Sequence, residues 1–202
     1  MNKLVLASNN PGKLREIGAL LAPLAIEVSA QASLAIAEAD EPHATFLENA
    51  LAKARHASRA SGLPALADDS GLCVDALGGA PGVHSAYYAG RDGSRDERDA
   101  RNNSKLLGAL AGVGDRRAHY YCVVVLLRRA DDPEPLVAEG VWRGEIASAP
   151  RGAGGFGYDP LFYLPERRCT SAELDADQKN RISHRGQALA RLLARLGDED
   201  RT

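Results

Sequence analysis

Cysteine is scarce in this chain, and its three copies do not have the spacing of a disulfide framework. Cys73, Cys122 and Cys169 stand far apart among 202 residues, and no CxxC pair occurs. An odd, scattered set of cysteines is typical of a reducing compartment rather than of a disulfide-stabilised secreted protein. Zinc is not predicted either, because no pair of His or Cys residues has the spacing of zinc ligands.

Long hydrophobic runs and a surplus of positive charge are also missing. The longest apolar run, CVVVLL at 122–127, is far shorter than the ~20 residues of a membrane-spanning helix. The run at 4–7 is too short for the apolar core of a signal peptide. A net charge of −2 argues against a broad basic surface for nucleic acid. We therefore expect a soluble cytoplasmic protein that binds neither membranes nor nucleic acid.

Two familiar phosphate-chemistry motifs are absent as well. The segment ASNNPGKLRE has Ala7 and Leu14 where a Walker A motif needs glycine and a hydroxyl residue, which excludes a P-loop ATPase. The acids Asp68 and Asp69 are adjacent, whereas a haloacid-dehalogenase-type site needs them two residues apart.

The residues that are present predict an α/β protein with a mixed central sheet and flanking helices. No internal repeat or clean linker divides the chain, so we expect a single domain over residues 1–202, with two lobes that are not independent. Residues 63–77 are predicted to form strand, turn and strand. The other predicted strands lie at 3–7, 26–30, 118–129, 136–148 and 161–164, and the predicted helices at 13–21, 45–62, 94–110 and from Ser183 onward. Pro23 is expected to stop the first helix.

Two of the predicted helices begin with positive charge, where the helix dipole is itself positive. Lys13 lies in the first turn of one helix, and His184 and Arg185 open the last one. A polyvalent anion such as a triphosphate would compensate the positive charge at both helix starts. Free amide groups at the start of the first helix would donate hydrogen bonds to it. The alternative is an ordinary Asn-Pro-Gly turn with Lys13 in water, and a surface start for the last helix.

Adjacent carboxylates follow a short apolar run, in ALADDSGLCVD. The segment is compatible with a simple DSG reverse turn, in which aspartate bonds to its own backbone. It is equally compatible with a magnesium site, because Mg²⁺ prefers a few carboxylates together with substrate phosphates. Glu41 and Glu48 are the other candidate acids, and Glu48 also completes a T-x-x-E helix cap with Thr45.

The segment GGFGYDP places Phe156 and Tyr158 between glycines, with Asp159 before a proline. An aromatic ring on such a loop could stack on a nucleobase. A packed loop anchor explains the same residues equally well.

Taken together, LASNNPGK, TFLENA, ADDSGL, VDALGGAPG, GGFGYDP and ISHRGQAL resemble motifs of the noncanonical purine nucleoside triphosphate pyrophosphatases, the inosine triphosphate pyrophosphatase family. The resemblance extends over residues 3–196. It implies two lobes around a substrate cleft, a homodimer, and Mg²⁺-dependent hydrolysis of ITP, dITP and XTP to the monophosphate and pyrophosphate. Such an enzyme removes deaminated purines from the nucleotide pool.

The resemblance also implies roles for individual residues. Asp69 matches the general base and metal ligand, with Asp68 in support, and Glu41 matches a second metal ligand. The implied substrate contacts are Ser8, Asn9, Asn10, Pro11, Gly12, Lys13, Ser70, Phe156, Gly157, Tyr158, Asp159, Lys179, His184 and Arg185. One position departs from the family, because Tyr87 stands in SAYY where similar sequences have arginine.

Two other functions compete with this interpretation. A septum-protein-like nucleotide pyrophosphatase of similar fold would act on dTTP, UTP or modified pyrimidine nucleotides. A nucleotide sensor would bind ITP with magnesium and release no pyrophosphate. The enzymatic interpretation requires Lys13, Asp69 and Arg185 to share one site.

Overall fold

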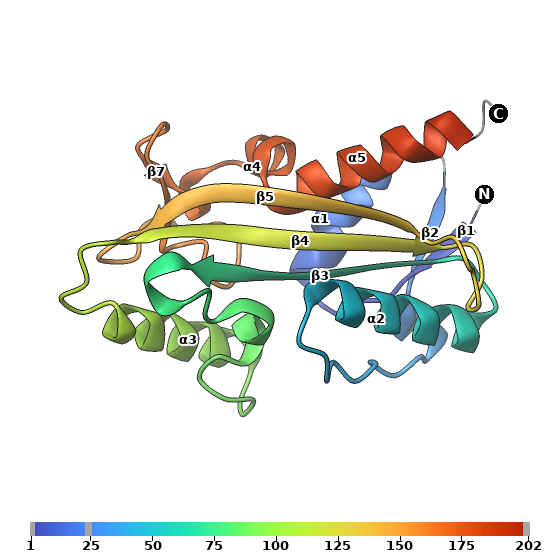
Figure 1. The fold of residues 1–202 in the computed structure, drawn as a ribbon, viewed down its shortest axis with the longest axis horizontal. Helices are drawn as coiled ribbons and strands as arrows, with labels where there is room; N and C mark the ends of the chain where they lie inside the picture. The colour runs from blue at the N-terminus through green and yellow to red at the C-terminus, as the bar shows by residue number, and fades with distance from the viewer. Residues whose placement is uncertain (1–2, 23–25, 200–202) are drawn as a thin grey trace. The chain divides into compact units, whose positions relative to one another are not determined.

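The computed structural model describes residues 3–22 and 26–199 (Figure 1). Within these residues, the strands form one seven-stranded sheet in the order β2-β1-β3-β4-β5-β6-β7. Their bounds are β1 Lys3–Leu6, β2 Glu27–Ala30, β3 Ala65–Val74, β4 Arg117–Leu127, β5 Leu136–Ile146, β6 Phe162–Leu164 and β7 Cys169–Thr170. β1 runs parallel to β2 and β3, whereas β6 runs antiparallel to β5 and β7. The predicted α/β class with a mixed sheet is confirmed.

The chain forms two compact units, each with a hydrophobic core of its own. Unit 1 consists of residues 1–69, 122–140 and 184–202, and unit 2 of residues 70–121 and 141–183. Strands β3, β4 and β5 each contribute residues to both units.

In unit 1, helices lie on both faces of the strands. Helices α1 (Pro11–Leu21) and α5 (His184–Glu199) contact each other, while α2 (Phe46–Ser61) contacts β1. Figure 1 shows α2 and α5 on opposite sides of the strands. The apolar side chains of α1 and α5 share one core with Leu4, Leu6 and Leu66. Leu189 and Leu192 of α5 are buried in this core.

Local signals in the sequence fix the ends of the first two helices. Asn10 caps α1 and Pro11 occupies its first turn, a position where proline is favoured. Thr45 caps α2 by accepting a hydrogen bond from the Glu48 amide, and Gly62 ends the helix with a left-handed φ of 70°. The predicted stop at Pro23 lies outside the described residues.

Unit 2 contains α3 (Arg95–Ala109), α4 (Ala176–Ile182), three short 3-10 turns and the short strands β6 and β7. Ser94 and Glu97 form the predicted capping box of α3, and Leu106 and Leu110 bury the far end of this helix. The core also contains an aromatic cluster, in which the Phe162 ring lies 4.7 Å from Tyr120 and 5.1 Å from Trp142 between centroids.

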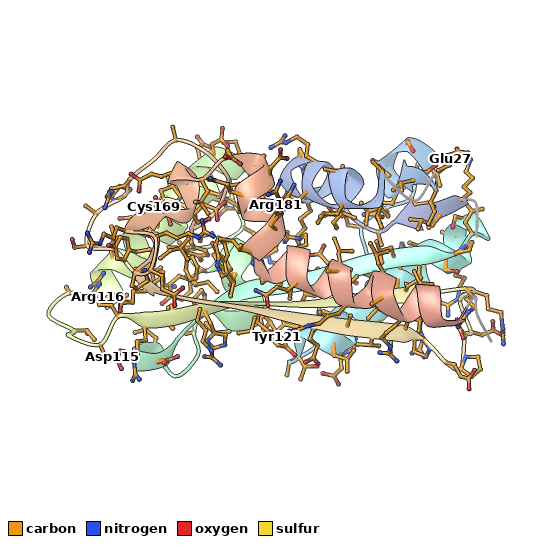
Figure 2. All side chains as sticks on the ribbon, turned by 90° about the horizontal axis from the view of Figure 1, so that it is seen from above. Glu27, Asp115, Arg116, Tyr121, Cys169 and Arg181 are labelled. Atoms are coloured by element: carbon orange, nitrogen blue, oxygen red, sulfur yellow. The ribbon has the colours of Figure 1, made fainter. Side chains whose placement is uncertain are left out.

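Arg116, labelled in Figure 2 beside Asp115, connects the end of α3 to the end of β5 within unit 2. Its guanidinium donates to the carbonyl oxygens of Ile146 and Ala147, the latter at 2.9 Å, and to that of Leu110 at 3.3 Å. These bonds hold the segment that follows α3 against the end of β5.

The strand–turn–strand prediction for residues 63–77 is wrong, because β3 continues through the two acids without a break. An extended strand can carry adjacent buried aspartates only if each carboxylate meets a positive charge on its own face. Helix α4 and strand β7 were also not predicted.

Among the described residues, no helix combines the length and the apolar character that crossing a membrane requires.

Candidate active site

Asp68 and Asp69 are adjacent in β3, and the pleat of the strand separates their carboxylates. Successive side chains of a strand point to opposite faces of the sheet, so Asp68 and Asp69 diverge. The side chain of Asp68 lies on the same face of β3 as that of Leu66, the face that α1 and α5 cover. The side chain of Asp69 lies on the opposite face, towards α2. The two carboxylates therefore have different partners, and they do not act as one chelating pair.

Asp68 lies at the centre of a buried ion cluster formed by α1, β3 and α5. Its Oδ2 atom accepts from Lys13 Nζ at 2.9 Å and from Arg185 Nε and Nη2 at 3.3 Å each. The other side of the Arg185 guanidinium pairs with Glu16. Burial alone would raise the pKa of Asp68, but the charges of Lys13 and Arg185 outweigh it and hold this pKa far below its usual range.

Asp69 has a different environment on the opposite face. Lys53 Nζ donates to Asp69 Oδ1 at 2.8 Å and to Glu41 at 2.6 Å, and Asn49 lies 3.4 Å from Asp69 Oδ2. Burial raises the pKa of Asp69 above its usual value, although Lys53 and Lys13 oppose this effect. The pKa values of two neighbouring carboxylates are thus pushed apart, an arrangement typical of acid–base sites.

Lys13 and Lys53 both act on the two aspartates, because the charge of each lysine lowers the pKa of Asp68 and that of Asp69. Lys13 and Arg185, the cations at the two helix starts, meet at Asp68. The compensating anion that the sequence led us to expect is, in this structure, a carboxylate of the chain itself. The side chain of Lys13 remains 15% exposed, whereas that of Asp68 is fully buried.

The expectation of free amides at the start of α1 is wrong. Asn10 Oδ1 accepts from the amides of Gly12 at 2.9 Å and Lys13 at 3.2 Å, and the Asn10 carbonyl accepts from Leu14. Pro11 has no N–H, so the whole first turn is satisfied by Asn10. Ser8 accepts from the Asn10 amide, while the buried Asn9 Oδ1 has no partner within the described residues.

A glycine sets how closely α5 approaches β5 in unit 1. A Cβ atom on Gly140 would lie 1.9 Å from the carbonyl oxygen of His184 and 2.8 Å from the amide of Ala188. Only glycine allows the first turn of α5 to lie directly on the strand at this point. The buried His184 and Arg185 are held in place by this contact.

The residues present fit a magnesium ion better than a fully protein-built metal cage. Within residues 3–22 and 26–199, no group of three or more His, Cys, Asp or Glu side chains could hold a metal ion. Asp69 and Glu41 nevertheless converge on a single cation, the Lys53 ammonium. Mg²⁺ is commonly held by one or two carboxylates, with phosphate oxygens and water completing its shell. Glu48 is bonded to Thr45, so Glu41 is the second acid at Asp69.

The predicted base-recognition residues lie in unit 2, where Asp159 organises them. Its Oδ2 accepts from the Phe156 amide at 2.8 Å and from Lys179 Nζ at 2.6 Å, and its Oδ1 accepts from Ser171 at 2.7 Å. The Phe156 ring lies between two cations, with Lys179 Nζ at 4.8 Å and the Arg95 guanidinium at 5.1 Å from its centroid.

Tyr158 and Ser70 differ from Phe156 in exposure and contacts. Tyr158 is 4% exposed, and its hydroxyl donates to the Ser85 carbonyl at 2.9 Å, so the ring is a packed anchor of the loop. Ser70 is half-buried and directly follows Asp69 in β3.

Comparison with known proteins gives one consistent result. The model of the Ham1 family matches residues 4–195. The chain belongs to the Ham1 family. It is 64% identical to a dITP/XTP pyrophosphatase of Nitrosomonas europaea over 99% of this chain and 97% of that protein. It is also 64% identical to the dITP/XTP pyrophosphatase of Burkholderia pseudomallei, over 98% of this chain and 94% of that protein.

Solved structures of Ham1 proteins have the same fold. A HAM1 protein from Coxiella burnetii is 49% identical, with a TM-score of 0.88 over 98% of this chain and 100% of that one. A nucleoside-triphosphatase / dITP/XTP pyrophosphatase from Mycobacterium abscessus is 41% identical, with a TM-score of 0.72 over 95% of this chain and 98% of that one.

Tyr87 is the position at which this chain departs from the family pattern. Two arginines nevertheless lie close to its ring. The Arg91 guanidinium lies 4.2 Å from the centroid of the Tyr87 ring, and that of Arg98 lies at 5.8 Å. Cation–π attraction to the Tyr87 ring thus keeps positive charge near the position at which similar sequences have an arginine.

Three residues of the unit 1 site were missed by the sequence analysis: Glu16, Asn49 and Lys53. Asn49 and Lys53 are four residues apart and therefore share one face of α2. An amide and an ammonium on the buried side of an alanine-rich helix would have been a usable signal. Glu16 lies one turn after Lys13 in α1, and only the fold brings it to Arg185.

Proposed function

We propose that this chain hydrolyses noncanonical purine nucleoside triphosphates, namely ITP, dITP and XTP, to the monophosphate and pyrophosphate. The observation that carries the proposal is the pair of carboxylates, Asp69 and Glu41, that converges on the Lys53 ammonium. The names of relatives that match nearly the whole chain support the substrate class. Magnesium as the metal, a homodimer and a cytoplasmic location belong to the same proposal and rest on the family resemblance.

Asp69 is the proposed base, held in place by Lys53 and Asn49. Its carboxylate orients the attacking water and accepts a proton from it, a role that its raised pKa favours. Lys13 binds the phosphates, together with Ser8 and Asn9, in the segment before α1. Magnesium bound at Asp69 and Glu41 would neutralise charge on the polyphosphate. Arg185 is only 2% exposed and paired with two acids, so its main effect is on the position and charge of Asp68.

The Phe156 ring and Lys179 are the proposed contacts for the purine. A site that donates hydrogen bonds to a 6-keto group rejects a 6-amino base, because its donors would be left unpaired.

A pyrophosphate-release assay over a panel of nucleotides tests the function. With Mg²⁺ we expect kcat/KM for ITP, dITP and XTP to exceed that for ATP and dTTP by about 100-fold, and chelation to abolish turnover. Highest activity on dTTP would show instead that the chain is a pyrophosphatase of pyrimidine nucleotides. Tight binding of ITP without release of pyrophosphate would make it a sensor.

The Lys13→Ala variant tests the phosphate contact. Loss of a charged donor should raise KM for ITP by about 10- to 100-fold, since such a hydrogen bond contributes about 1.5–3 kcal/mol. Lys3→Ala is the matched control, because Lys3 is an exposed lysine of the same unit that pairs with Glu27. If KM is unchanged in Lys13→Ala, the segment before α1 has only a structural role.

A further inference from the structure

The peptide groups around Phe156 are all paired within unit 2. The Phe156 amide donates to Asp159, and the Phe156 carbonyl accepts from the Asp159 amide at 3.2 Å. The next peptide is held by α3: the Gly157 amide donates to Asp99 Oδ2 at 2.9 Å, and the Gly157 carbonyl accepts from Asn103 Nδ2 at 2.9 Å. Asp99 and Asn103 are called the Gly157 clamp below.

The clamp belongs to one face of α3. Arg95, Asp99 and Asn103 follow one another at intervals of four residues, which places them in one row along the helix. The first member of the row stacks its guanidinium on the Phe156 ring, and the other two bind the peptide that follows this ring. A single helix face thus contacts both the aromatic side chain and its backbone.

Helix α3 is a rigid support for this row. Its start is closed by the capping box of Ser94 and Glu97, and Leu106 is fully buried near its end. Between them, the buried Asn102 accepts from the Ala89 amide at 2.7 Å and donates to the Ser85 carbonyl at 3.2 Å. A side chain on this helix can therefore fix the position of whatever it binds.

Two glycines of the loop give its backbone conformational freedom that hydrogen bonds must restrict. Gly155 and Gly157 have φ values of +74° and +63°, in the left-handed region that glycine enters readily. A Cβ on Gly157 would meet nothing within 4 Å, so steric crowding does not require glycine here. Its positive φ is what favours glycine at this position. Without the clamp, the Gly157 amide and carbonyl would lose their partners in α3, and the Phe156 ring would be oriented through Asp159 and its neighbouring cations alone.

We propose that Asp99 and Asn103 are positioning residues for purine selectivity, which act by fixing the Gly157 peptide and hence the plane of the Phe156 ring. The proposal rests on the proposed function, because it takes Phe156 as the surface on which the base stacks. The two residues touch neither the substrate nor the reacting atoms. Their removal should change KM and the choice of base, and leave kcat for ITP nearly unchanged.

The test compares Asp99→Ala and Asn103→Ala with two control variants. Each loses one hydrogen bond to Gly157, and we expect a three- to tenfold rise in KM for dITP with kcat within twofold of wild type. The ratio of kcat/KM for dITP to that for dATP should fall by a similar factor. Asp99→Asn keeps an acceptor oxygen and should restore most of the selectivity. Asp96→Ala and Ser104→Ala, at exposed positions of the same helix, should behave as wild type.

The outcomes separate this inference from the proposed function. Wild-type KM and wild-type selectivity in both alanine variants would overturn the positioning role and leave the function intact. A wild-type protein that releases no pyrophosphate from any purine would overturn the function, and equilibrium binding of dITP and dATP to the same variants would then decide the role of the clamp. If Asp99→Ala does not fold, Asn103→Ala carries the test, since it removes only the donor to the Gly157 carbonyl.

Discussion

Replacement of Asp69 by asparagine is expected to reduce kcat for ITP by about 10²- to 10⁴-fold, the range that a positioned acid or base contributes. The amide has the size of the carboxylate and retains an oxygen that can accept from Lys53, so the strand should pack as before. It cannot take a proton from water at neutral pH. Nucleotide affinity, measured by calorimetry on the same variant, should therefore persist while pyrophosphate release is lost.

Asp75→Asn is the matched control for this substitution. Asp75 directly follows β3, and its side chain is 44% exposed beside Arg117 and His119. Its neutralisation should leave kcat unchanged. Near-normal turnover in Asp69→Asn would remove Asp69 from the role of base, whatever the affinity for nucleotide.

Replacement of Arg185 by methionine is expected to lower the free energy of unfolding by about 3–5 kcal/mol, as is usual when one partner of a buried ion pair is removed. The guanidinium connects Asp68 on β3 with Glu16 on α1. Methionine fills most of the space but leaves Glu16 without its cation and Asp68 with Lys13 alone. Urea unfolding followed by circular dichroism measures the loss.

Arg191→Met provides the comparison on the same helix. Arg191 is exposed and donates to the Glu139 carbonyl at 2.7 Å, so its loss should cost less than about 1 kcal/mol. An equally small loss in Arg185→Met would show that the ion cluster does not stabilise the fold. A double variant that also carries Asp68→Asn should recover part of the stability, because it removes the buried charge that Arg185 compensates.

The fold was predictable where the signal is local. Thr45 and Ser94 cap helices as the sequence indicates, because a cap depends only on residues three positions away. β3 was not predictable as one strand, because two adjacent aspartates break the apolar pattern. The cations that make them compatible with a strand come from α1, α2 and α5, and no local pattern shows them.

The site was predictable in part for the same reason. The cationic helix starts led us to expect that a triphosphate compensates the charge of Lys13 and Arg185, whereas the structure places both at Asp68. Binding of a triphosphate there stays a prediction. Lys53 and Glu16 escaped prediction, because their partners are 16 and 169 residues away in the chain. A single interdependent domain over residues 1–202 stays a prediction.

The order in which the chain is synthesised gives the Asp68 cluster a further consequence. Arg185 lies 117 residues beyond Asp68, and α5 supplies Leu189 and Leu192 to the same core. A polypeptide leaving the ribosome therefore holds Asp68 with one cation, under an incomplete apolar layer, until α5 has been synthesised. Nascent chains that stop before residue 184 should be substrates for chaperones and proteases, and the ion cluster around Asp68 forms only once α5 is present.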